Sequence, residues 1–287
     1  MSQQITEAFV TQFRDGITQR AQQMGSRLRP WFRVESGITG TSASYDFVGK
    51  RTPARRQARH ADTVLTDTPH DRRWVDLAVY DDADLIDKPD LVRTLTDPTN
   101  AYSQAMALGM GRKIDEVGLA GAVGTTRTGV EGDGTATLPA AHDIAGIAGL
   151  VLATLLNVKQ ILDEDEQPDT RYWAVHSAAV QDLLGISEIQ SVDFNALKAL
   201  VEGQVAFFLG FQFMRVEPPI LTSTGAGGTT DTIAWADGAV LLGIGADIQG
   251  SIDMRPDKNM STQVFYSMDL GACRMDDNGV VRQKINN

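Results

Sequence analysis

Residues that could carry out chemistry are few in this chain of 287 residues. His176 and Ser177 could in principle act as a base and a nucleophile. Adjacent residues on a strand point to opposite faces, however, and residues 171–176 are predicted to form a strand. The sequence also contains no G-x-S-x-G elbow. A soluble serine hydrolase that uses this pair is therefore the least favoured of three functions that the sequence allows.

Metal and nucleotide sites also find little support. The run Asp163, Glu164, Asp165 and Glu166 has the charge of a calcium site, but it lacks the ordered alternation and the glycine of an EF-hand loop. The segment Gly225–Gly228 lacks the G-K-[ST] ending of a phosphate-binding loop. We therefore expect no catalytic residue, no metal and no cofactor.

The most unusual segment is a basic stretch that contains few apolar residues. It has seven positive and three negative side chains, so it is locally about +4 in a chain of net charge −11. A segment with so little apolar surface cannot bury much of itself, and we expect it to project from its own body. A cationic projection on an acidic body indicates a protein that docks onto copies of itself. The positive residues are Lys50, Arg51, Arg55, Arg56, Arg59, Arg72 and Arg73.

The bulk composition is that of an ordinary globular protein, with 42% hydrophobic and 22% charged residues. No apolar run approaches the roughly 20 residues needed to span a bilayer, and the N-terminus lacks the pattern of a secretory signal. The lone Cys273 excludes an intrachain disulfide and fits a reducing cytoplasm. A pI near 4.8 argues against coating nucleic acid, although an acidic wall could still enclose DNA.

The N-terminal region is predicted to be an amphipathic helix over residues 4–24. Apolar residues recur there every four positions, which places them on one face of a helix. This face could pack on its own domain or lie as an arm on a neighbouring subunit, and the sequence favours neither. The stripe consists of Ile5, Phe9, Phe13 and Ile17.

Two extended segments flank the basic stretch. Residues 27–49 and 73–80 are rich in aromatic and β-branched side chains, which favour strands. Two strands joined by a long polar tip form the kind of loop that usually serves binding. After them, Asp97-Pro98 marks the start of a long helix that continues to about residue 120, because aspartate caps free amides and proline suits the first turn.

The remainder of the chain mixes helices and strands. A second helix is predicted over residues 142–163, and a third over residues 193–201. Ser177 is expected to cap a further helix that ends at Leu184. This mixture is typical of the α+β class. Strands are predicted at 171–176, 207–216, 232–235, 240–244, 262–268 and 280–285.

The order of these elements resembles that of the major capsid proteins of tailed bacteriophages. The likeness covers nearly the whole chain: an N-terminal arm, an extended loop, a long spine helix, an α/β portion and closing strands. Its strength lies in this order rather than in any single motif. The residues that carry it are Ala61-Asp62-Thr63, Arg72-Arg73-Trp74, Asp84-Leu85-Ile86-Asp87, Asp90-Leu91-Val92, Asp97-Pro98, Tyr102, Gly111–Asp115, Tyr172–Val175, Gly210–Phe213, Pro218 and Asp237–Val240.

The resemblance implies the tailed-phage major capsid protein fold and a division of the chain. In this family the extended loop lies on an adjacent subunit and the arm reaches across the inner surface. Since the chain starts almost at its arm, the resemblance implies a separate scaffolding protein. The implied parts are an N-terminal arm (1–30), a peripheral domain (31–44 and 81–142) with the spine helix (about 97–120), an extended β-hairpin loop (45–80), an axial domain (143–256) and closing strands (257–287).

We therefore expect a structural subunit that self-assembles into hexamers and pentamers of an icosahedral virion capsid around double-stranded DNA. Assembly would take place in the host bacterial cytoplasm, without a membrane and without sequence-specific DNA binding. A portal and a decoration protein are further candidate partners. The alternative is an encapsulin-like compartment shell of the same fold, whose N-terminal helix would help hold a cargo enzyme. The hypothetical intersubunit contacts join Arg55, Arg56, Arg59, Arg72 and Arg73 to Asp81, Asp82, Asp84, Asp163, Glu164, Asp165 and Glu166.

Overall fold

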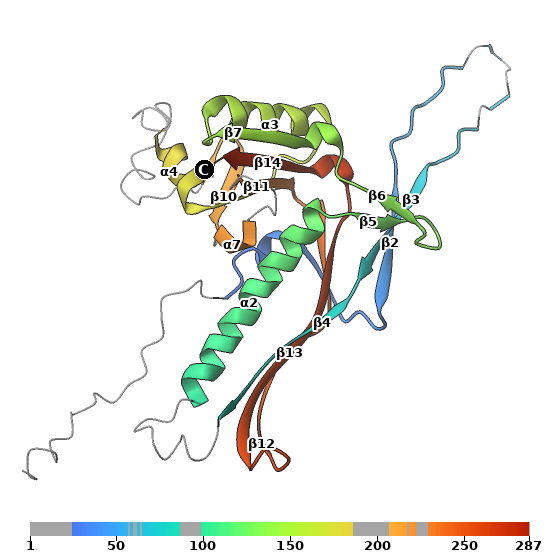
Figure 1. Cartoon of the computed structure of the whole chain (residues 1–287). Coiled ribbons are helices and arrows are strands. Elements are labelled where there is room, and N and C mark those ends of the chain that lie inside the picture. Colours follow the sequence, from blue (N-terminus) through green and yellow to red (C-terminus); the bar gives the residue numbers. More distant parts are fainter. Residues whose placement is uncertain are drawn as a thin grey trace, which may run out of the picture.

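A computed structural model describes most of the chain as a mixture of helices and sheets (Figure 1). This mixture confirms the predicted α+β class. The predicted helices at 4–24 and 193–201 lie outside the described residues. The described residues are 25–56, 58–59, 62–63, 65–86, 99–185, 207–216, 218–221 and 229–286.

The long helix α2 (Thr99–Val123) packs on a four-stranded sheet and agrees closely with the prediction. Its apolar residues recur every three or four positions, so Met106, Met110 and Ile114 are buried together. In the sheet, β1 runs parallel to β12 and the other neighbours are antiparallel. The strand order is β1 (Arg33–Ser36), β12 (Val240–Arg255), β13 (Ser261–Arg274) and β4 (Ala78–Ile86).

Helix α2 approaches its neighbours closely because it carries glycines. A Cβ atom added at Gly121 would lie 2.6 Å from the backbone of Ala272 on β13. One added at Gly118 would overlap the ring of Phe32. Glycine thus lets the backbone of the helix lie against the sheet and against the chain that precedes β1.

A six-stranded sheet forms a second layer, and α3 (Leu152–Glu164) and α4 (Ser177–Leu184) lie over it in Figure 1. Leu155 and Leu183 of these helices pack with Trp173 and Phe211 of the sheet in one buried cluster. The strand order is β7 (Asp143–Ala148), β14 (Val280–Asn286), β11 (Thr229–Ala236), β8 (Arg171–Val175), β10 (Phe211–Arg215) and β9 (Phe207–Phe208).

An aromatic cluster joins the two layers. Trp235 of the six-stranded sheet stacks on Phe32 at 5.3 Å between ring centroids, and Trp31 stacks on Tyr172 at 5.0 Å. The indole Nε1 of Trp235 donates a hydrogen bond to the carbonyl of Trp31 at 3.1 Å. The short helix η2 (Arg29–Trp31) therefore connects the start of the described chain to both layers.

A third sheet carries the projecting loop. It has the order β2-β3-β5-β6, and all neighbouring strands are antiparallel. The chain between β2 and β3 extends away from the rest of the molecule (Figure 1). The strands are β2 (Ser42–Val48), β3 (His70–Asp76), β5 (Thr126–Thr128) and β6 (Gly134–Ala136), and the remaining short helices are η3 (Ala140–His142), α7 (Pro218–Leu221) and η5 (Asp277–Gly279).

The predicted helix at 142–163 is wrong in its first part. Asp143–Ala148 form β7 beside β14, and α3 begins only at Leu152. Between them Gly149 has a positive φ of 76°, which ends the strand with a turn. The apolar residues of this stretch fit both the helical and the strand periodicity. Residues 143–148 form a strand because β14 pairs with them.

The predicted division into peripheral and axial domains stays a prediction. β12, which falls within the predicted axial domain, pairs in the four-stranded sheet under α2. β14, which falls among the predicted closing strands, pairs in the six-stranded sheet. Each sheet therefore draws strands from distant parts of the sequence.

Candidate assembly surfaces

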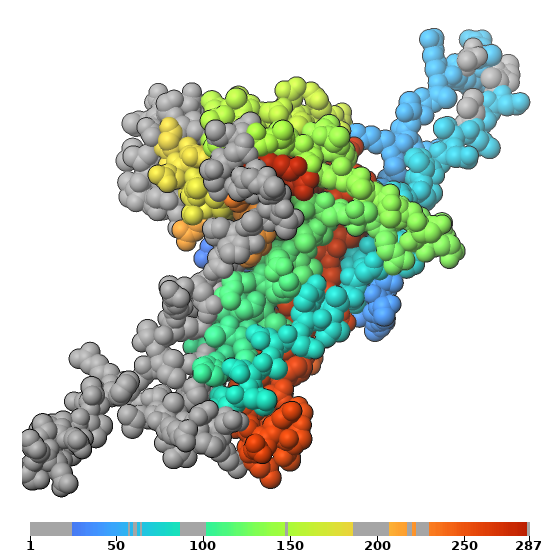
Figure 2. Space-filling model, in the orientation of Figure 1, coloured from blue at the N-terminus to red at the C-terminus, as the bar shows by residue number. Residues whose placement is uncertain are grey.

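The loop between β2 and β3 stands clear of the body (Figure 2). Residues 51–56 and 65–67 are all exposed. The contacts near its base are local, because Gly49 donates its amide to the carbonyl of Pro69 at 2.9 Å and Arg51 Nη2 donates to the carbonyl of Thr66 at 2.8 Å. The structure therefore bears out the expected projection of this segment.

Three of the predicted contact residues lie on the exposed loop. Arg55, Arg56 and Arg59 are all accessible to solvent. The guanidinium of Arg56 donates to the carbonyls of Ala58 and Arg59 at 2.9 and 2.8 Å. Both bonds stay within the loop, so these cations face outward, where a second molecule could reach them.

Arg72 is held on one face of the loop base. It makes a bidentate ion pair with Asp46 on β2, with nitrogen–oxygen distances of 2.5 and 3.0 Å. The hydrogen bond from Arg72 holds the pKa of Asp46 below its usual value. On the same face, Trp74 Nε1 donates to the carbonyl of Gly129 at 2.8 Å, and the guanidinium of Arg127 lies 5.5 Å from the Trp74 ring centroid. This face is thereby fastened to the β5–β6 hairpin.

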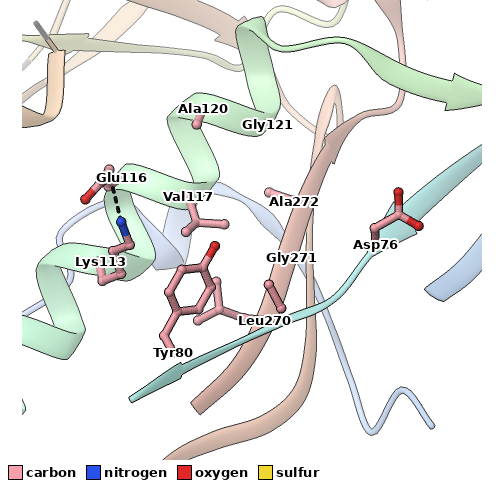
Figure 3. A pocket seen from close by; sticks show the side chains of 11 residues that line it. Asp76, Tyr80, Lys113, Glu116, Val117, Ala120, Gly121, Leu270, Gly271 and Ala272 are labelled. Atoms are coloured by element: carbon pink, nitrogen blue, oxygen red, sulfur yellow. Dashed lines mark hydrogen bonds and ion pairs between the residues drawn. The ribbon is translucent and has the colours of Figure 1, made fainter. Parts of the chain in front are cut away.

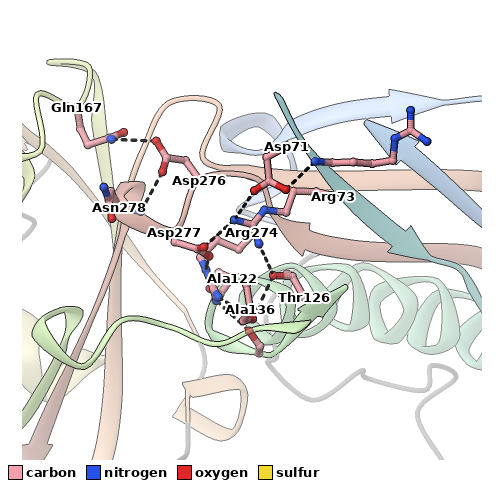
Figure 4. Close-up of polar contacts among 12 residues, drawn as sticks. Asp71, Arg73, Ala122, Thr126, Ala136, Gln167, Arg274, Asp276, Asp277 and Asn278 are labelled. Carbon is pink, nitrogen blue, oxygen red and sulfur yellow. Dashed lines mark hydrogen bonds and ion pairs between the residues drawn. The ribbon is translucent and has the colours of Figure 1, made fainter. Parts of the chain in front are cut away.

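Arg73 points to the opposite face and is buried, with 4% of the residue exposed (Figure 4). Its Nη2 lies 2.6 Å from Asp277 Oδ2 and 3.5 Å from Asp71 Oδ2. Its guanidinium carbon also lies 5.6 Å from the centroid of the Phe47 ring. Arg73 was expected to contact a neighbouring subunit, but the structure engages it within its own chain because strand alternation turns it inward. Its burial leaves little of Arg73 for a second subunit to contact.

The carboxylate of Asp277 binds a second arginine. Arg274, which is fully buried, donates from Nε to Asp277 Oδ1 at 2.7 Å. Its Nη1 donates to the carbonyls of Ala122 and Gly124 at 3.0 and 2.9 Å, and its Nη2 donates to the carbonyl of Ala136 at 3.2 Å. A cation thus satisfies carbonyls at the end of α2, where the helix dipole favours positive charge.

The first acidic candidate surface is β4, the edge strand of the four-stranded sheet. Asp81, Asp82 and Asp84 are all exposed on it. Asp84 is paired in register with Val264, whose side chain packs with α2 residues, so Asp82 and Asp84 share the helix side of the sheet. Asp81 lies on the other side. Carboxylates on both sides of a strand edge suit an extended cationic partner.

The second acidic candidate surface, at the end of α3, is largely engaged within the chain. Asp163 lies 2.6 Å from Arg171 Nη1 and 3.0 Å from Lys159 Nζ. Asp165 lies 3.1 Å from His142 Nε2. These two carboxylates already have cationic or hydrogen-bonding neighbours, so they have less charge to offer a second molecule than the β4 edge.

The other two residues of that run are exposed but poorly placed. Glu164 is the last residue of α3 and accepts a hydrogen bond from Gln160 at 2.7 Å. Glu166 follows with a positive φ of 53°. A carboxylate at a helix C-terminus is opposed by the helix dipole. The β4 edge is therefore the better of the two acidic surfaces.

Residues 26–28, near the end of the predicted arm, are fixed to α2. Asp115, a buried carboxylate on the helix, accepts hydrogen bonds from Ser26 Oγ at 2.5 Å and from the amides of Arg27 and Leu28 at 2.9 and 3.0 Å. This cluster holds residues 26–28 against the helix. The four residues expected to pack the arm lie outside the described residues: Ile5, Phe9, Phe13 and Ile17.

A hollow of about 280 Å³ lies between α2, β4 and β13 (Figure 3). Tyr80, Val117 and Leu270 give it an apolar lining. Lys113 lies on its rim, 2.7 Å from Glu116 and 5.3 Å from the centroid of the Tyr80 ring. Tyr80 immediately precedes the acidic residues of β4. The hollow therefore lies next to this acidic strand, on the side that faces the helix.

The candidate hydrolase pair is not supported by its surroundings. His176 is buried at the N-cap position of α4, whereas Ser177 is exposed on the first turn. The predicted cap is also wrong, because the N-cap residue is His176 and its side chain makes no capping hydrogen bond. Within the described ranges, no group of histidine, cysteine and acidic residues could hold a metal ion. No described helix is long and apolar enough to cross a membrane.

Sequence reasoning missed three residues that hold these surfaces in place: Asp115, Arg274 and Asp277. The contact of Asp115 with residues 26–28 was not predicted. A signal was present, because a carboxylate next to buried Ile114 in an apolar stripe needs hydrogen-bond donors. Arg274 and Asp277 carried no comparable signal, since their neighbours come from distant strands.

The comparisons with known proteins agree with this architecture. The model of the phage capsid protein family matches residues 5–286. The capsid protein of cyanophage P-SCSP1u superimposes with a TM-score of 0.73 at 16% identity, over 99% of this chain and 94% of that one. The mature capsid of bacteriophage PhiM1 gives 0.70 at 11% identity, over 97% and 93%. The cyanophage Pam1 capsid gives 0.69 at 15% identity, over 97% of both chains. A search of curated protein sequences gave no match.

The chain belongs to the phage capsid protein family, since the family model covers nearly all of it. It has the tailed-phage major capsid fold and is a structural subunit of a virion capsid that associates with copies of itself. This membership confirms the resemblance seen in the sequence. It also favours the phage shell over the encapsulin-like compartment and over the hydrolase.

Proposed function

We propose that the subunit forms hexamers and pentamers of a closed icosahedral shell around double-stranded DNA, assembled in the host bacterial cytoplasm. The observation that supports this most directly is an exposed cationic loop on a chain of net charge −11. The subunit acts without catalysis of its own. Scaffolding, portal and decoration proteins are candidate partners, and the DNA is enclosed without sequence-specific contacts, as the acidic pI of 4.8 favours.

The loop of one subunit docks on the β4 edge of the next. Arg55, Arg56 and Arg59 supply the cations, and Asp81 and Asp84 supply carboxylates on the two sides of the edge. Arg72 is left out because Asp46 already pairs with it. The carboxylates at the end of α3 are secondary partners, since Asp163 and Asp165 are engaged within the chain.

The contact between a loop and a β4 edge is weak, and the shell is stabilised because the same contact is repeated in every subunit. One exposed ion pair contributes only about 0–1 kcal/mol. Each subunit of a closed shell makes the same contact with a neighbour by rotation, so the small terms recur around every ring. Reversing two charges converts attraction into repulsion at every copy. The contact should also weaken with salt, because a Debye length of about 10 Å at 0.1 M screens exposed charges.

The test is a double reversal, Arg55→Glu with Arg56→Glu. Both residues are exposed, and the side-chain hydrogen bonds of Arg56 stay within the loop, so the subunit should fold normally. We expect folded subunits and no particles in electron microscopy and sedimentation. A matched control changes the acidic residues of the same loop, Asp62→Asn with Asp67→Asn, which should leave particles intact. Wild-type yields of particles from the double reversal would refute the proposed contact.

A charge swap identifies the partner surface. Asp81→Arg with Asp84→Arg should block assembly alone and restore particles when combined with the double reversal. The same reversals at Glu164 and Glu166 should not restore them. Rescue by the α3 residues instead of the β4 residues would move the docking site to the end of α3.

A further inference from the structure

The base of the loop acts as a lever arm. Each limb of the loop has about ten residues and can span up to roughly 30 Å when extended. A rotation of about 10° at the base would therefore move the tip by about 5 Å. A displacement of that size exceeds the length of an ion pair, so the loop cannot find its partner unless the base holds its angle.

Both faces of the base are fastened, but by different means. On the outer face, Arg72 pairs with Asp46 of the neighbouring strand, which ties the two limbs to each other. Arg72 Nη1 also donates to the carbonyl of Val130 at 3.4 Å, and Trp74 donates to Gly129, so this face is attached to the β5–β6 hairpin. On the inner face, Arg73 pairs with Asp277, which lies in η5 after β13 and belongs to the body. The Arg73 pair thus ties the loop to the segment after β13, which the other face does not reach (Figure 4).

Asp277 transmits this attachment to the long helix. Its two oxygens receive different arginines, with Arg73 on Oδ2 at 2.6 Å and Arg274 on Oδ1 at 2.7 Å. Arg274 in turn holds the carbonyls of Ala122 and Gly124 at the end of α2. One carboxylate therefore connects the loop strand β3 with the end of the helix through charge-assisted hydrogen bonds, whose fork geometry fixes direction as well as distance.

We propose that Arg73, Asp277 and Arg274 are positioning residues that set the angle between the extended loop and the spine helix, and thereby the curvature of the shell. This inference rests on the proposed docking of the loop on a second subunit. Within the cluster, Arg274 also caps α2, so its loss would affect the whole fold. Arg73 is the informative residue, because its partners lie at the junction alone.

The angle can be measured without assembly. Spin labels at Thr63→Cys on the loop and Asn157→Cys on α3 report the distance between the loop and the body, since both positions are exposed and the native Cys273 is buried. In full-length subunits kept apart by the Arg55→Glu and Arg56→Glu reversals, pulsed electron paramagnetic resonance should give one narrow distance. Arg73→Met should shift or broaden it by about 5 Å, the displacement expected for a rotation of about 10°.

Arg72→Met is the matched control, because it removes the pair with Asp46 and one 3.4 Å hydrogen bond to Val130 but keeps the Arg73–Asp277 pair, so the mean distance should stay unchanged. Arg73→Lys keeps the charge but loses the fork, and it should give an intermediate width. If Arg73→Met does not fold, the distance measured in Arg73→Lys tests the positioning role instead. In the assembling background, Arg73→Met should yield particles of mixed diameter, whereas Arg72→Met should yield uniform ones.

An unchanged distance in Arg73→Met, or in Arg73→Lys where Arg73→Met does not fold, would overturn the positioning role. This result is separate from the docking test. If the Arg55 and Arg56 reversals fail to block assembly, the docking contact is wrong whatever the loop angle. If they block assembly and the angle is insensitive to Arg73, only the positioning role is wrong.

Discussion

Two glycines on α2 lie two residues apart and should respond to the same substitution with opposite signs. A Cβ atom at Gly111 would lie 2.6 Å from backbone atoms of Gly25 and Ser26. A Cβ atom at Gly109 would meet only Arg112 Nη2 at 3.7 Å and Asp82 Oδ2 at 3.9 Å, which are ordinary contacts. Neither glycine has a positive φ. Each therefore gains about 1 kcal/mol of helix propensity when it is changed to alanine.

The clash decides the sign at Gly111. Forcing an extra carbon into a packed contact costs about 1–3 kcal/mol. The opposing backbone cannot move away freely, because Ser26, Arg27 and Leu28 are held by Asp115, and each hydrogen bond to a charged group contributes about 1.5–3 kcal/mol. After the propensity gain of about 1 kcal/mol is subtracted, we expect Gly111→Ala to lower the free energy of unfolding by up to about 2 kcal/mol net. Gly109→Ala should raise it by up to about 1 kcal/mol.

Urea unfolding of unassembled subunits, followed by tryptophan fluorescence, measures both changes. Trp31 and Trp235 lie beside the affected segment and report its release. The two variants differ by the clash alone, about 1–3 kcal/mol, and a companion thermal melt should show this difference as a gap of about 2–12 °C in melting temperature. If Gly111→Ala is as stable as Gly109→Ala, the described packing of the N-terminal segment on α2 is wrong.

The remaining predictions concern buried titratable groups. Burial raises the pKa of Asp231 above 3.8, so its stabilising protonated form is lost as pH rises through the folded-state pKa. Asp231→Asn should therefore stabilise the subunit at neutral pH, and the gain should vanish below about pH 4. The hydrogen bond from Arg282 lowers the pKa of Asp143, so Asp143→Asn should destabilise the subunit at neutral pH, and this loss should shrink as pH falls below 3.8. Urea titrations of each variant and of the wild type at several pH values check both predictions. A stability difference from the wild type that does not change with pH would contradict them. Burial also raises the pKa of Cys273 to about 12, so thiol reagents at neutral pH should label it only after unfolding; rapid labelling of native subunits would exclude its burial.

Local signals predicted the elements that form on their own. The Asp97-Pro98 start and the apolar stripe placed the long helix within a few residues of the observed Thr99–Val123. The shortage of apolar residues predicted the projecting loop, because a segment that cannot bury surface has no reason to fold back. Both predictions depend on neighbouring residues alone.

The lengths of two strands, and the fact that residues 143–148 form a strand rather than a helix, depend on partner strands that are distant in the sequence. The strand predicted at 240–244 extends to Arg255, and the one predicted at 262–268 extends to Arg274, because the two pair along this whole length. Asp143–Ala148 became a strand because β14 lay beside it. Local propensity carried too little information to decide these cases.

The tertiary structure also decided what each charge does. Asp115 lies on the long helix, yet its oxygens hold residues 27 and 28 near the end of the predicted arm. Asp163 was expected to face a neighbour, yet Arg171 and Lys159 lie within 3.0 Å of it. A list of acidic residues therefore overstates the surface available for docking.

The sequence alone determined that this chain has an acidic body, an arginine-rich projection and the element order of a capsid subunit, since composition and periodicity are properties of the chain itself. It could not distinguish the adjacent Arg72 and Arg73, which differ in neither type nor neighbourhood. The fold separated them, because strand alternation turns one to the surface and buries the other against Asp277, a residue 204 positions away. Proximity of that kind exists only after the chain has folded.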